Sequence, residues 1–573
     1  MAEAARAVKP DDETISRQRL AADPAVSAFV SANAGSGKTY VLATRVIRLL
    51  LDGVDPSKLL CLTYTKTAAA EMKGRIFKRL GGWVTMDDAA LRKELVSVQG
   101  REPKRDTMVL ARTLFARSLE APGGLKIQTI HAFCEALLHR FPLEANVAGH
   151  FELLDDYRAE AIIAEAKRAV LGGVARPPYL VDAIDDILTT HGEAKFDALL
   201  TNIIARRREL AMFFAGSGLA NERQRLVRQA LGVDEHATEA SILKQAWPLP
   251  WFGEAQNVEA ILAHEASQTR TTIREFARNV RSASKLHDLR DRFEALKQCF
   301  LKGKDDEYGL RTQHMFPKNL CAAIPGYQDI HGHAAQTVLD VQHALAALGE
   351  ADDTMRALTV AKALIGHYET LKRVRGYLDF DDLIERTAAM LRRQGGGAWV
   401  RYKLDQGIDH ILVDEAQDTS PLQWDVIQTF ADEFFDGDGA RVDQSVRTVF
   451  AVGDEKQSIY SFQGADPKGF ARSLDYFKTR VQGAEQHFEA VPLDRSFRSA
   501  TSVLKAVDLT FSVPTTRAGL SDAEIPPEHT ALRDDAPGEV VIWDVEKSDR
   551  APDDPEDWRQ PVDAPRAGEV AVA

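Results

Sequence analysis

The chain has 573 residues, of which 45% are hydrophobic and 27% are charged, as is typical of soluble globular proteins with several domains. Its net charge of −13 excludes a protein that coats nucleic acid through a basic overall surface, so any contact with nucleic acid must be local. No apolar run reaches the roughly 18 residues of a transmembrane helix, and the N-terminus lacks the apolar core of a signal peptide, so no membrane attachment is expected.

The first predicted element is a short apolar strand over residues 26–30. It leads into residues 31–39, which read S-A-N-A-G-S-G-K-T, and a helix is expected over residues 40–51. This stretch matches the phosphate-binding pattern G-x-x-x-x-G-K-[ST] except at the first position, where Ala32 stands. Ala32 is tolerable because that position makes the turn and does not hold phosphate. The flanking strand and helix disfavour the alternative, a glycine-rich turn with a chance lysine.

The chemistry of this loop suits a nucleoside triphosphate with magnesium. Gly35 and Gly37 allow backbone N–H groups to turn toward an anion, and the N-terminus of the next helix adds unpaired amides. Lys38 can reach the β- and γ-phosphates, and the Thr39 hydroxyl can ligate Mg²⁺. The predicted cofactor-binding residues of the loop are Ala32, Asn33, Ala34, Gly35, Ser36, Gly37, Lys38 and Thr39.

Strands and helices continue to alternate up to about residue 141, which predicts a parallel α/β sheet. A strand is expected at residues 59–64 and a helix at 67–80, and residues 127–134 form a further landmark. From about residue 145 to 375 the apolar residues recur at helical spacing, so this block is predicted to be an all-helical insertion.

The insertion carries positive charges at residues 206–208 and at Lys297, Lys302 and Lys304. Each group is interpreted as a solvated helix face, with a contact to phosphate as the open alternative. No metal centre is expected in it, because Asp329, His331 and His333 lack a further ligand and resemble a loop with solvated histidines.

The cysteines also give no indication of a metal centre, because they are scattered along the chain. No C-x-x-C spacing occurs, which disfavours zinc and iron–sulfur sites and indicates a reducing cytoplasm. The four cysteines are Cys61, Cys134, Cys299 and Cys321.

Alternation resumes near residue 377, and an apolar strand at 410–413 ends in Asp414 and Glu415. A nucleotide site needs one carboxylate to hold Mg²⁺ through water and a second to orient and deprotonate the attacking water. These adjacent carboxylates suit the two tasks. Another strand, at residues 447–452, precedes Gln457, whose amide can bind both a γ-phosphate and a water molecule.

Aromatic and basic residues follow this glutamine. Tyr460 and Phe462 can stack on nucleic-acid bases or belong to the core, and the core interpretation is favoured for Tyr460. A new segment begins near Pro492, and its Arg498 can close over a γ-phosphate or occupy a surface turn. The chain then becomes rich in Pro and charged residues, apart from a strand-like run at residues 538–543.

Taken together, these blocks resemble the UvrD/Rep-type DNA helicases, and most closely the AddA subunits of AddAB helicase–nucleases. Seven blocks occur in family order. They are the segment around Gln18, A-N-A-G-S-G-K-T, L-T-Y-T-K-T-A-A-A-E-M, T-I-H-A-F-C, V-D-E-A-Q-D-T-S, V-G-D-E-K-Q-S-I-Y-S-F-Q-G-A-D and L-D-R-S-F-R-S. T-I-H-A-F-C and L-D-F-D-D-L, at residues 378–383, favour AddA.

The resemblance implies ATP and Mg²⁺ as cofactors and assigns roles around them. Gln18 would read the adenine, Asp414 would bind the metal together with Thr39, and Gln457 would sense the γ-phosphate. The implied catalytic residues are Glu415, Lys38, Gln457 and Arg498, the last as an arginine finger.

It also implies a single-stranded DNA path. Tyr460 and Phe462 lie in the block that couples ATP to DNA, and family members often have Trp in place of Phe462 and Arg in place of Gln463. The implied DNA-binding residues are Thr63, Thr65, His131, Phe133, Tyr460 and Phe462.

The fold implied is α/β, with a RecA-like P-loop NTPase lobe, a large all-helical insertion and the start of a second RecA-like lobe. The first lobe would comprise residues 1–145 and 376–490, the insertion residues 146–375, and the incomplete second lobe with its polar tail residues 491–573.

Family members continue far beyond this chain, so it is expected to be an N-terminal portion without the later motor motifs and the nuclease domain. The intact protein would be an ATP-dependent 3′→5′ DNA helicase for double-strand break repair by homologous recombination, and its partners would be DNA and an AddB-type protein. The alternative is a truncated ATP- and single-stranded-DNA-binding module without motor activity. An enzyme that phosphorylates a small molecule is disfavoured, because such enzymes are usually compact and lack the arrangement of Gln457 and Phe462.

Overall fold

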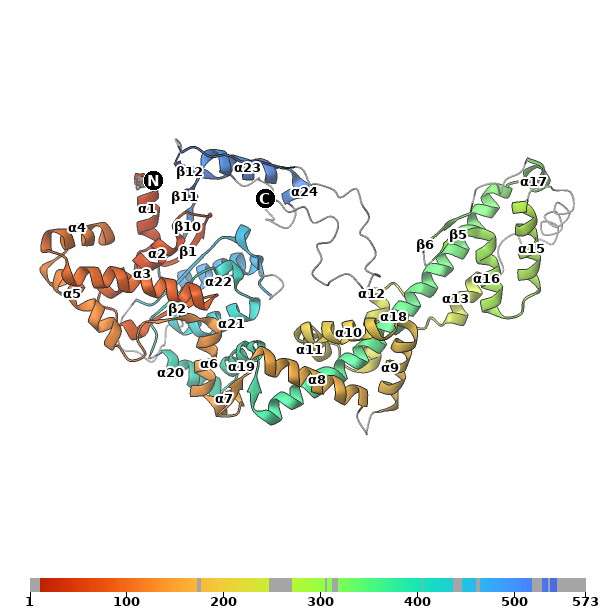
Figure 1. Ribbon diagram of the computed structural model, residues 1–573, viewed down its shortest axis with the longest axis horizontal. Helices are drawn as coiled ribbons and strands as arrows, with labels where there is room; N and C mark the ends of the chain where they lie inside the picture. The colour runs from red at the N-terminus through yellow and green to blue at the C-terminus, as the bar shows by residue number, and fades with distance from the viewer. Residues whose placement is uncertain are drawn as a thin grey trace, which may run out of the picture. The chain divides into compact units, whose positions relative to one another are not determined.

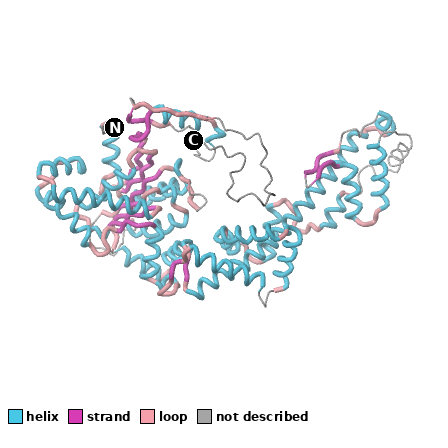
Figure 2. Tube along the Cα trace, viewed as in Figure 1, coloured by secondary structure: helices cyan, strands magenta, loops and turns pink. Residues whose placement is uncertain are grey.

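The computed structural model describes residues 11–172, 177–246, 271–304, 307–311, 318–405, 407–435, 446–459, 464–517, 528–533 and 536–543. The chain forms two compact units, of which the first comprises Met1–Phe151 with Leu378–Ala573 and the second Glu152–Tyr377. Helices prevail in both units, and six of the twelve described strands form one sheet in the first unit (Figures 1 and 2).

A six-stranded sheet is the centre of the first unit, with the strand order β10-β1-β9-β8-β2-β3 and every pair of neighbours parallel. Its strands are β1 (Ser27–Ala32), β2 (Leu59–Thr63), β3 (Lys126–Thr129), β8 (His410–Val413), β9 (Thr448–Gly453) and β10 (Phe488–Leu493). The prediction of an α/β fold with a parallel sheet is confirmed, and all four predicted strands up to residue 452 lie in this sheet.

Both faces of the sheet are buried, which is why its strands read as continuous apolar runs. Alternate residues of β1 show this. Ala28 and Val30 belong to a core with α2 (Lys38–Leu51), α3 (Lys66–Thr85), α4 (Asp88–Gln99) and α5 (Arg105–Glu120). Phe29 points to the other side, where its ring lies 6.2 Å from that of Trp424 and 5.7 Å from that of Phe477.

The second face is covered by helices that come from later parts of the chain. They are α6 (Ile130–Arg140), α19 (Phe380–Arg392), α21 (Pro421–Ala431) and α22 (Pro467–Gly483). Contacts of α19 with α6 and α21, and of α22 with β10, join them into one layer. The smaller helices α7 (Pro142–Ala145) and α20 (Gly396–Asp405) lie beside this layer.

A buried arginine of α2 binds the segment that leads into β1. The Arg45 side chain is fully buried, and its guanidinium donates to the carbonyl oxygens of Ala21 at 3.0 Å, Asp23 at 2.7 Å and Val26. The guanidinium carbon lies 5.0 Å from the ring centroid of Phe450. Burial lowers the pKa of Arg45 to about 9, so the side chain remains charged at neutral pH.

We expect the Arg45→Met variant to lose about 3–5 kcal/mol of the free energy of unfolding, because it leaves one buried and two partly buried carbonyls without their donors. Urea denaturation at pH 7 measures this. The matched control is Arg92→Met, which removes an exposed arginine paired with Glu102 at 3.4 Å and is expected to cost about 0–1 kcal/mol. Equal losses in the two variants would contradict the structural role of Arg45.

His410 begins β8 and is also buried. Its Nδ1 lies 2.8 Å from the hydroxyl of Thr448, and burial, reinforced by the charge of Arg45, lowers its pKa from 6.5 to about 3. The folded protein therefore holds a neutral imidazole that the unfolded chain would protonate below about pH 6.5. As far as this group is concerned, the free energy of unfolding is highest above about pH 6.5 and decreases as the pH falls toward about 3.

The free energy of unfolding should accordingly fall by about 2 kcal/mol more between pH 7 and pH 5 in the wild type than in the His410→Gln variant. Urea denaturation at both pH values gives the four free energies required. His150→Gln, at an exposed position of the same unit, should keep the wild-type pH dependence. An unchanged pH dependence in His410→Gln would show that this imidazole is not the acid-sensitive group.

The second unit is built around α18 (Tyr327–Arg375). One core at the N-terminal part of α18 includes Phe276, Phe300 and Val338, and another at its C-terminal part includes Ile184 and Leu364. The other helices that the structure describes in this unit are α8 (Asp156–Gly172), α9 (Pro178–His191), α10 (Glu193–Ala205), α11 (Arg207–Gly216), α12 (Ala220–Ala230), α13 (Glu239–Gln245), α15 (Thr271–Lys285), α16 (Leu289–Phe300) and α17 (Lys318–Ala323).

The two ends of this unit meet in a short two-stranded sheet of β4 (Glu152–Leu153) and β7 (Tyr377–Leu378). The N–H of Glu152 donates to the carbonyl of Gly376 at 3.0 Å. The chain thus leaves and re-enters the sheet-bearing unit at one place.

The prediction of an all-helical insertion over residues 146–375 is wrong at two places, because β4 lies within those bounds and because β5 (Leu301–Lys304) and β6 (Glu307–Leu310) form an antiparallel pair. Leu301 faces Leu310 in this pair, and Gly303, with φ 140°, adopts a backbone that other residues rarely reach. Lys302 and Lys304 therefore lie on a strand and not on a helix face.

The predicted loop around Asp329, His331 and His333 is also wrong, because all three residues lie in α18. His331 is fully buried, and its ring lies 5.1 Å from that of Phe300 and 5.8 Å from that of Tyr327. Helical spacing places this histidine on the apolar side of α18, where burial lowers its pKa.

The N-terminal segment around Gln18 forms a helix, α1 (Asp12–Ala21), which the carboxylate of Asp11 caps by accepting from the N–H of Thr14 at 3.1 Å. One terminal segment differs from expectation, because the strand-like run at 538–543 is in neither a helix nor a strand. After β10 come β11 (Arg495–Ala500), α23 (Thr501–Ser512), α24 (Pro514–Arg517) and β12 (Thr530–Arg533), and β11 pairs with β12 in a separate parallel sheet. Among the described residues, none of the helices combines the length and apolarity needed to cross a bilayer.

Candidate functional site

The glycine loop lies between the end of β1 and the start of α2, at the carboxyl edge of the sheet. Gly35 has φ 73° and Gly37, which caps α2, has φ 95°. The backbone conformation at Gly37 therefore favours glycine, and an added Cβ atom there would lie 3.2 Å from Nε2 of Gln18. The hydroxyl of Ser36 is buried without a hydrogen-bond partner among the described residues.

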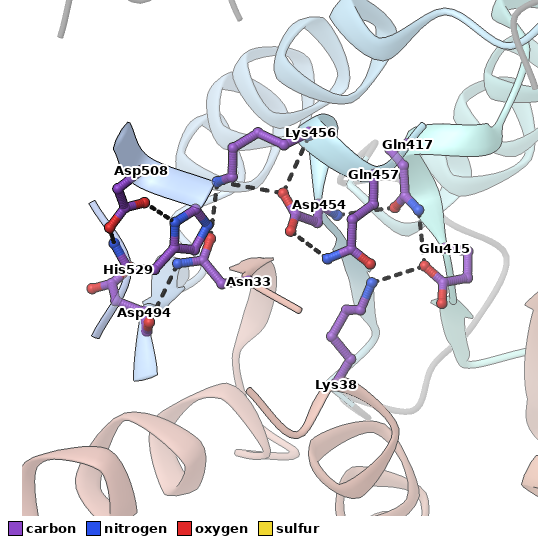
Figure 3. A network of polar contacts seen from close by, with 10 residues as sticks. All are labelled: Asn33, Lys38, Glu415, Gln417, Asp454, Lys456, Gln457, Asp494, Asp508 and His529. Carbon is purple, nitrogen blue, oxygen red and sulfur yellow. Dashed lines mark hydrogen bonds and ion pairs between the residues drawn. The ribbon is translucent and has the colours of Figure 1, made fainter. Parts of the chain in front are cut away.

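Lys38 and Glu415 meet across this edge although 377 positions separate them in the chain. Lys38 is the first residue of α2 and Glu415 follows β8, and the Nζ of Lys38 lies 3.0 Å from Oε2 of Glu415 (Figure 3). Parallel strands bring their carboxyl ends to the same edge, which explains how two distant blocks converge.

The two adjacent carboxylates differ in their surroundings. Asp414 is buried, and burial together with the neighbouring charge of Glu415 raises its pKa to about 6. Glu415 is partly exposed and has φ 48°, a conformation that is uncommon for a residue with a side chain. Its N–H donates to Oδ1 of Asp414 at 3.0 Å.

A magnesium ion fits the residues present. The hydroxyl of Thr39, in the first turn of α2, and the carboxylate of Asp414 are oxygen ligands of the kind that Mg²⁺ takes, and a divalent cation would stabilise the charged form of Asp414. Within the described ranges no group of three His, Cys, Asp or Glu side chains could hold a metal by itself. An ion at this site would therefore complete its shell with phosphate oxygens and water.

Gln417 is a functional candidate that the sequence analysis did not single out. Its Nε2 donates to Oε2 of Glu415 at 2.8 Å, and its Oε1 accepts from the N–H of Asp454 at 3.0 Å. The side chain is buried in η2 (Ala416–Asp418). Gln417 thus fixes the orientation of Glu415 and links β8 to the chain beyond β9. Only its position in the D-E-A-Q-D block signalled it.

Gln457 ends the short helix η4 (Glu455–Gln457), which follows β9. Its Nε2 donates to Oδ2 of Asp454 at 2.6 Å. Gln457 and Glu415 therefore belong to one polar network, joined through Asp454 and Gln417 (Figure 3). The sequence analysis placed Gln457 at this edge but did not identify Asp454, whose carboxylate is buried.

The segment of Arg498 lies directly against the glycine loop. The N–H of Phe497 donates to the carbonyl of Gly35 at 2.9 Å, and a Cβ atom at Gly35 would lie 2.5 Å from Cβ of Arg498. Arg498 is exposed. This part of β11 therefore borders the loop that would hold phosphate.

A cavity of about 530 Å³ opens beside the loop. Gln18, from α1, lines it together with Gly37, Tyr40 and Phe497. The cavity offers two aromatic side chains and one amide, a combination suited to a flat heterocycle with hydrogen-bonding edges. The other loop residues differ in exposure, since Ala32 is buried at the end of β1 and Ala34 is exposed.

Of the residues predicted to contact DNA, Thr65 is exposed and His131 is half-buried, whereas Thr63 and Phe133 are buried. Thr63 ends β2, where its hydroxyl donates to the carbonyl of Thr65 at 3.0 Å, and Thr65 caps α3. His131 lies in α6, where burial lowers its pKa, and its ring meets that of Phe380 edge-on at 5.5 Å. Phe133 is buried in the core at 6.3 Å from the ring of Phe430. The predicted DNA contacts of these residues stay predictions.

Two further predicted residues, Tyr460 and Phe462, lie outside the described residues. The structure thus brings together the glycine loop, Lys38, Asp414, Glu415, Gln457 and the backbone of Arg498. It places Thr63 at the end of β2, Thr65 at the N-cap of α3 and His131 in α6.

Comparison with known proteins agrees with this geometry. A family model described as the UvrD/REP helicase N-terminal domain matches residues 14–478. That range includes the glycine loop, both carboxylates and Gln457.

Individual relatives are similar at modest identity, and each is the A subunit of an ATP-dependent helicase/nuclease. The relative from Enterococcus faecalis is 27% identical over 527 residues, covering 84% of this chain and 37% of the relative. The one from Latilactobacillus sakei is 27% identical over 507 residues, covering 84% and 53%. That of Ligilactobacillus salivarius is 26% identical over 586 residues, covering 94% and 42%. The chain thus spans between 37% and 53% of the length of these three relatives.

Proposed function

This chain belongs to the UvrD/REP helicase family, and from that premise we propose that it carries the ATP-hydrolysing lobe of a DNA helicase–nuclease protein of the AddA type. The observation that carries the proposal is the convergence of Lys38 with Glu415, at 3.0 Å, on one edge of a parallel sheet. Two blocks so far apart in the chain meet there with the chemistry that triphosphate hydrolysis requires.

In the proposed reaction, five residues have separate roles around bound MgATP. Lys38 neutralises charge on the β- and γ-phosphates, while Thr39 and Asp414 hold the magnesium ion. Glu415 orients the attacking water and takes its proton, and Gln457 contacts the γ-phosphate. Because Gln417 holds the Glu415 carboxylate at 2.8 Å, the base is oriented before substrate arrives.

The proposal includes two RecA-like lobes, with the second beginning after β10. The separate sheet of β11 and β12 supports such a start, and Arg498 is the proposed arginine finger from that side. Gln18 is proposed to read the adenine, with the 530 Å³ cavity as support. The bounds proposed for the lobes and the insertion remain residues 1–145, 146–375, 376–490 and 491–573.

Single-stranded DNA is the proposed substrate, with 3′→5′ movement and a role in double-strand break repair by homologous recombination. Thr63, Thr65, His131, Phe133, Tyr460 and Phe462 are proposed to line its path. An AddB-type protein is the proposed partner and the cytoplasm the proposed location. Free thiols at all four cysteines are compatible with that compartment.

A second candidate function is that of an ATP- and single-stranded-DNA-binding module without motor activity. ATP hydrolysis by purified residues 1–573, measured with and without single-stranded DNA, separates the two candidates. Strong stimulation by DNA supports the motor and excludes the passive module, whereas nucleotide binding without stimulated turnover supports the module.

A further inference from the structure

A polar bridge crosses the site between the glycine loop and the helix that carries Gln457. The Nζ of Lys456 donates to Oδ1 of Asn33 at 2.9 Å, and the two residues are 423 positions apart (Figure 3). Lys456 is the middle residue of η4, directly before Gln457. We call this contact the Asn33–Lys456 bridge.

Each end of the bridge is anchored further. The Nζ of Lys456 lies 3.4 Å from Oδ1 of Asp454, the carboxylate that also accepts from Gln457. Asn33 uses its other amide atom, Nδ2, to donate to the carbonyl of Asp494 at 3.3 Å, and its backbone N–H donates to Leu493 at 3.1 Å. Asp494 is the residue between β10 and β11.

Asn33 is therefore the point where three parts of the site meet: the phosphate loop, the Gln457 helix and the segment that leads into β11. Asn33 and Asp454 are both buried. In such surroundings a charged hydrogen bond is stronger than at the surface, and its loss leaves the remaining partner unsatisfied. The phosphate-binding motif itself requires no particular residue at position 33.

We propose that Asn33 and Lys456 are positioning residues, which hold the Gln457 helix at a fixed distance from the phosphate loop and couple both to the start of β11. This inference rests on the proposed ATPase function. A single turn such as η4 is weakly constrained by its own backbone, so the bridge, together with the bond from Gln457 to Asp454, sets where the Gln457 side-chain amide lies. The bridge therefore affects the rate of hydrolysis more than the affinity for ATP.

Steady-state ATP hydrolysis with saturating single-stranded DNA tests the bridge. We expect Lys456→Met to lower kcat by about tenfold or more while KM for ATP changes by less than about threefold, and Lys456→Arg to recover most of the loss. Combining Lys456→Met with Asn33→Ala should lower kcat by less than the product of the two single effects, because both variants remove the shared Asn33–Lys456 contact. Lys478→Met, at an exposed lysine of α22, controls for the loss of charge and should retain the wild-type kcat.

Hydrogen exchange without nucleotide tests the same bridge independently of activity. Lys456→Met should raise the exchange rates of the Gln457 and Phe497 amides at least about tenfold, and Lys478→Met should not. If the wild type lacks DNA-stimulated hydrolysis, the proposed function is wrong. The exchange rates then still test whether the bridge positions the Gln457 helix. Unchanged exchange rates, or an unchanged kcat in an active enzyme, or multiplicative effects in the double variant would overturn the inference.

Discussion

Replacement of Lys38 by alanine is expected to lower kcat for ATP hydrolysis by about 100- to 1000-fold, with and without DNA. Lys38 is the cation at the start of α2, and its ammonium lies 3.0 Å from Glu415. Removing it deletes the charge that would stabilise the phosphates in the transition state and leaves Glu415 without its cationic partner. Phosphate release under steady-state conditions measures the loss.

Lys93→Ala is the matched control, because it removes an exposed lysine of α4 in the same unit. Its turnover should equal that of the wild type. Because Lys38 lies outside the hydrophobic core clusters, both variants should unfold at the wild-type temperature, and thermal unfolding checks this. DNA-stimulated turnover that survived in Lys38→Ala would refute the assignment of the phosphate loop.

Glu415→Gln should separate binding from chemistry. The amide keeps the shape of the side chain but cannot accept the proton of the attacking water, so kcat should fall by about 100- to 10,000-fold. Affinity for ATP should stay near the wild-type value, because Lys38 and the loop amides remain. A fluorescent ATP analogue measures binding, and single-turnover hydrolysis measures the chemical step.

The chain offers an unusual control for this variant. Glu485 is an exposed glutamate with φ 57°, close to the φ of 48° at Glu415, so Glu485→Gln makes the same change on a similar backbone. It should leave both binding and hydrolysis unchanged. If Glu415→Gln lost ATP binding as well as hydrolysis, Glu415 would be part of the binding site and not the base.

Sequence alone predicted the elements whose signal is local. The strand of residues 410–413 coincides with β8, and the glycine loop follows β1 as expected, because apolar runs and glycine spacing are read from neighbouring residues. The same blocks identified the family, which the match over residues 14–478 confirms. Convergence of Lys38 and Glu415 could be inferred, since parallel strands share their carboxyl edge.

The contacts between distant side chains could not be read in this way. Gln417 meets the Asp454 backbone 37 positions away and Lys456 meets Asn33 423 positions away, and neither pair has a periodic pattern. The burial of His331 was missed because three nearby polar residues were read as a loop, although helical spacing turns only one of them inward. Likewise, the β5–β6 pair interrupts a block whose average composition is helical.

The pairing of β4 with β7 bears on how this protein can change over evolutionary time. The N–H of Glu152 bonds to the carbonyl of Gly376, so the two ends of the inserted segment Glu152–Tyr377 are held together. The entropy cost of closing a loop grows only slowly with the number of residues in it, by about 0.6 kcal/mol for each doubling. Lengthening, trimming or exchanging that module would therefore leave the strand order of the central sheet, and with it the alignment of Lys38 and Glu415, intact.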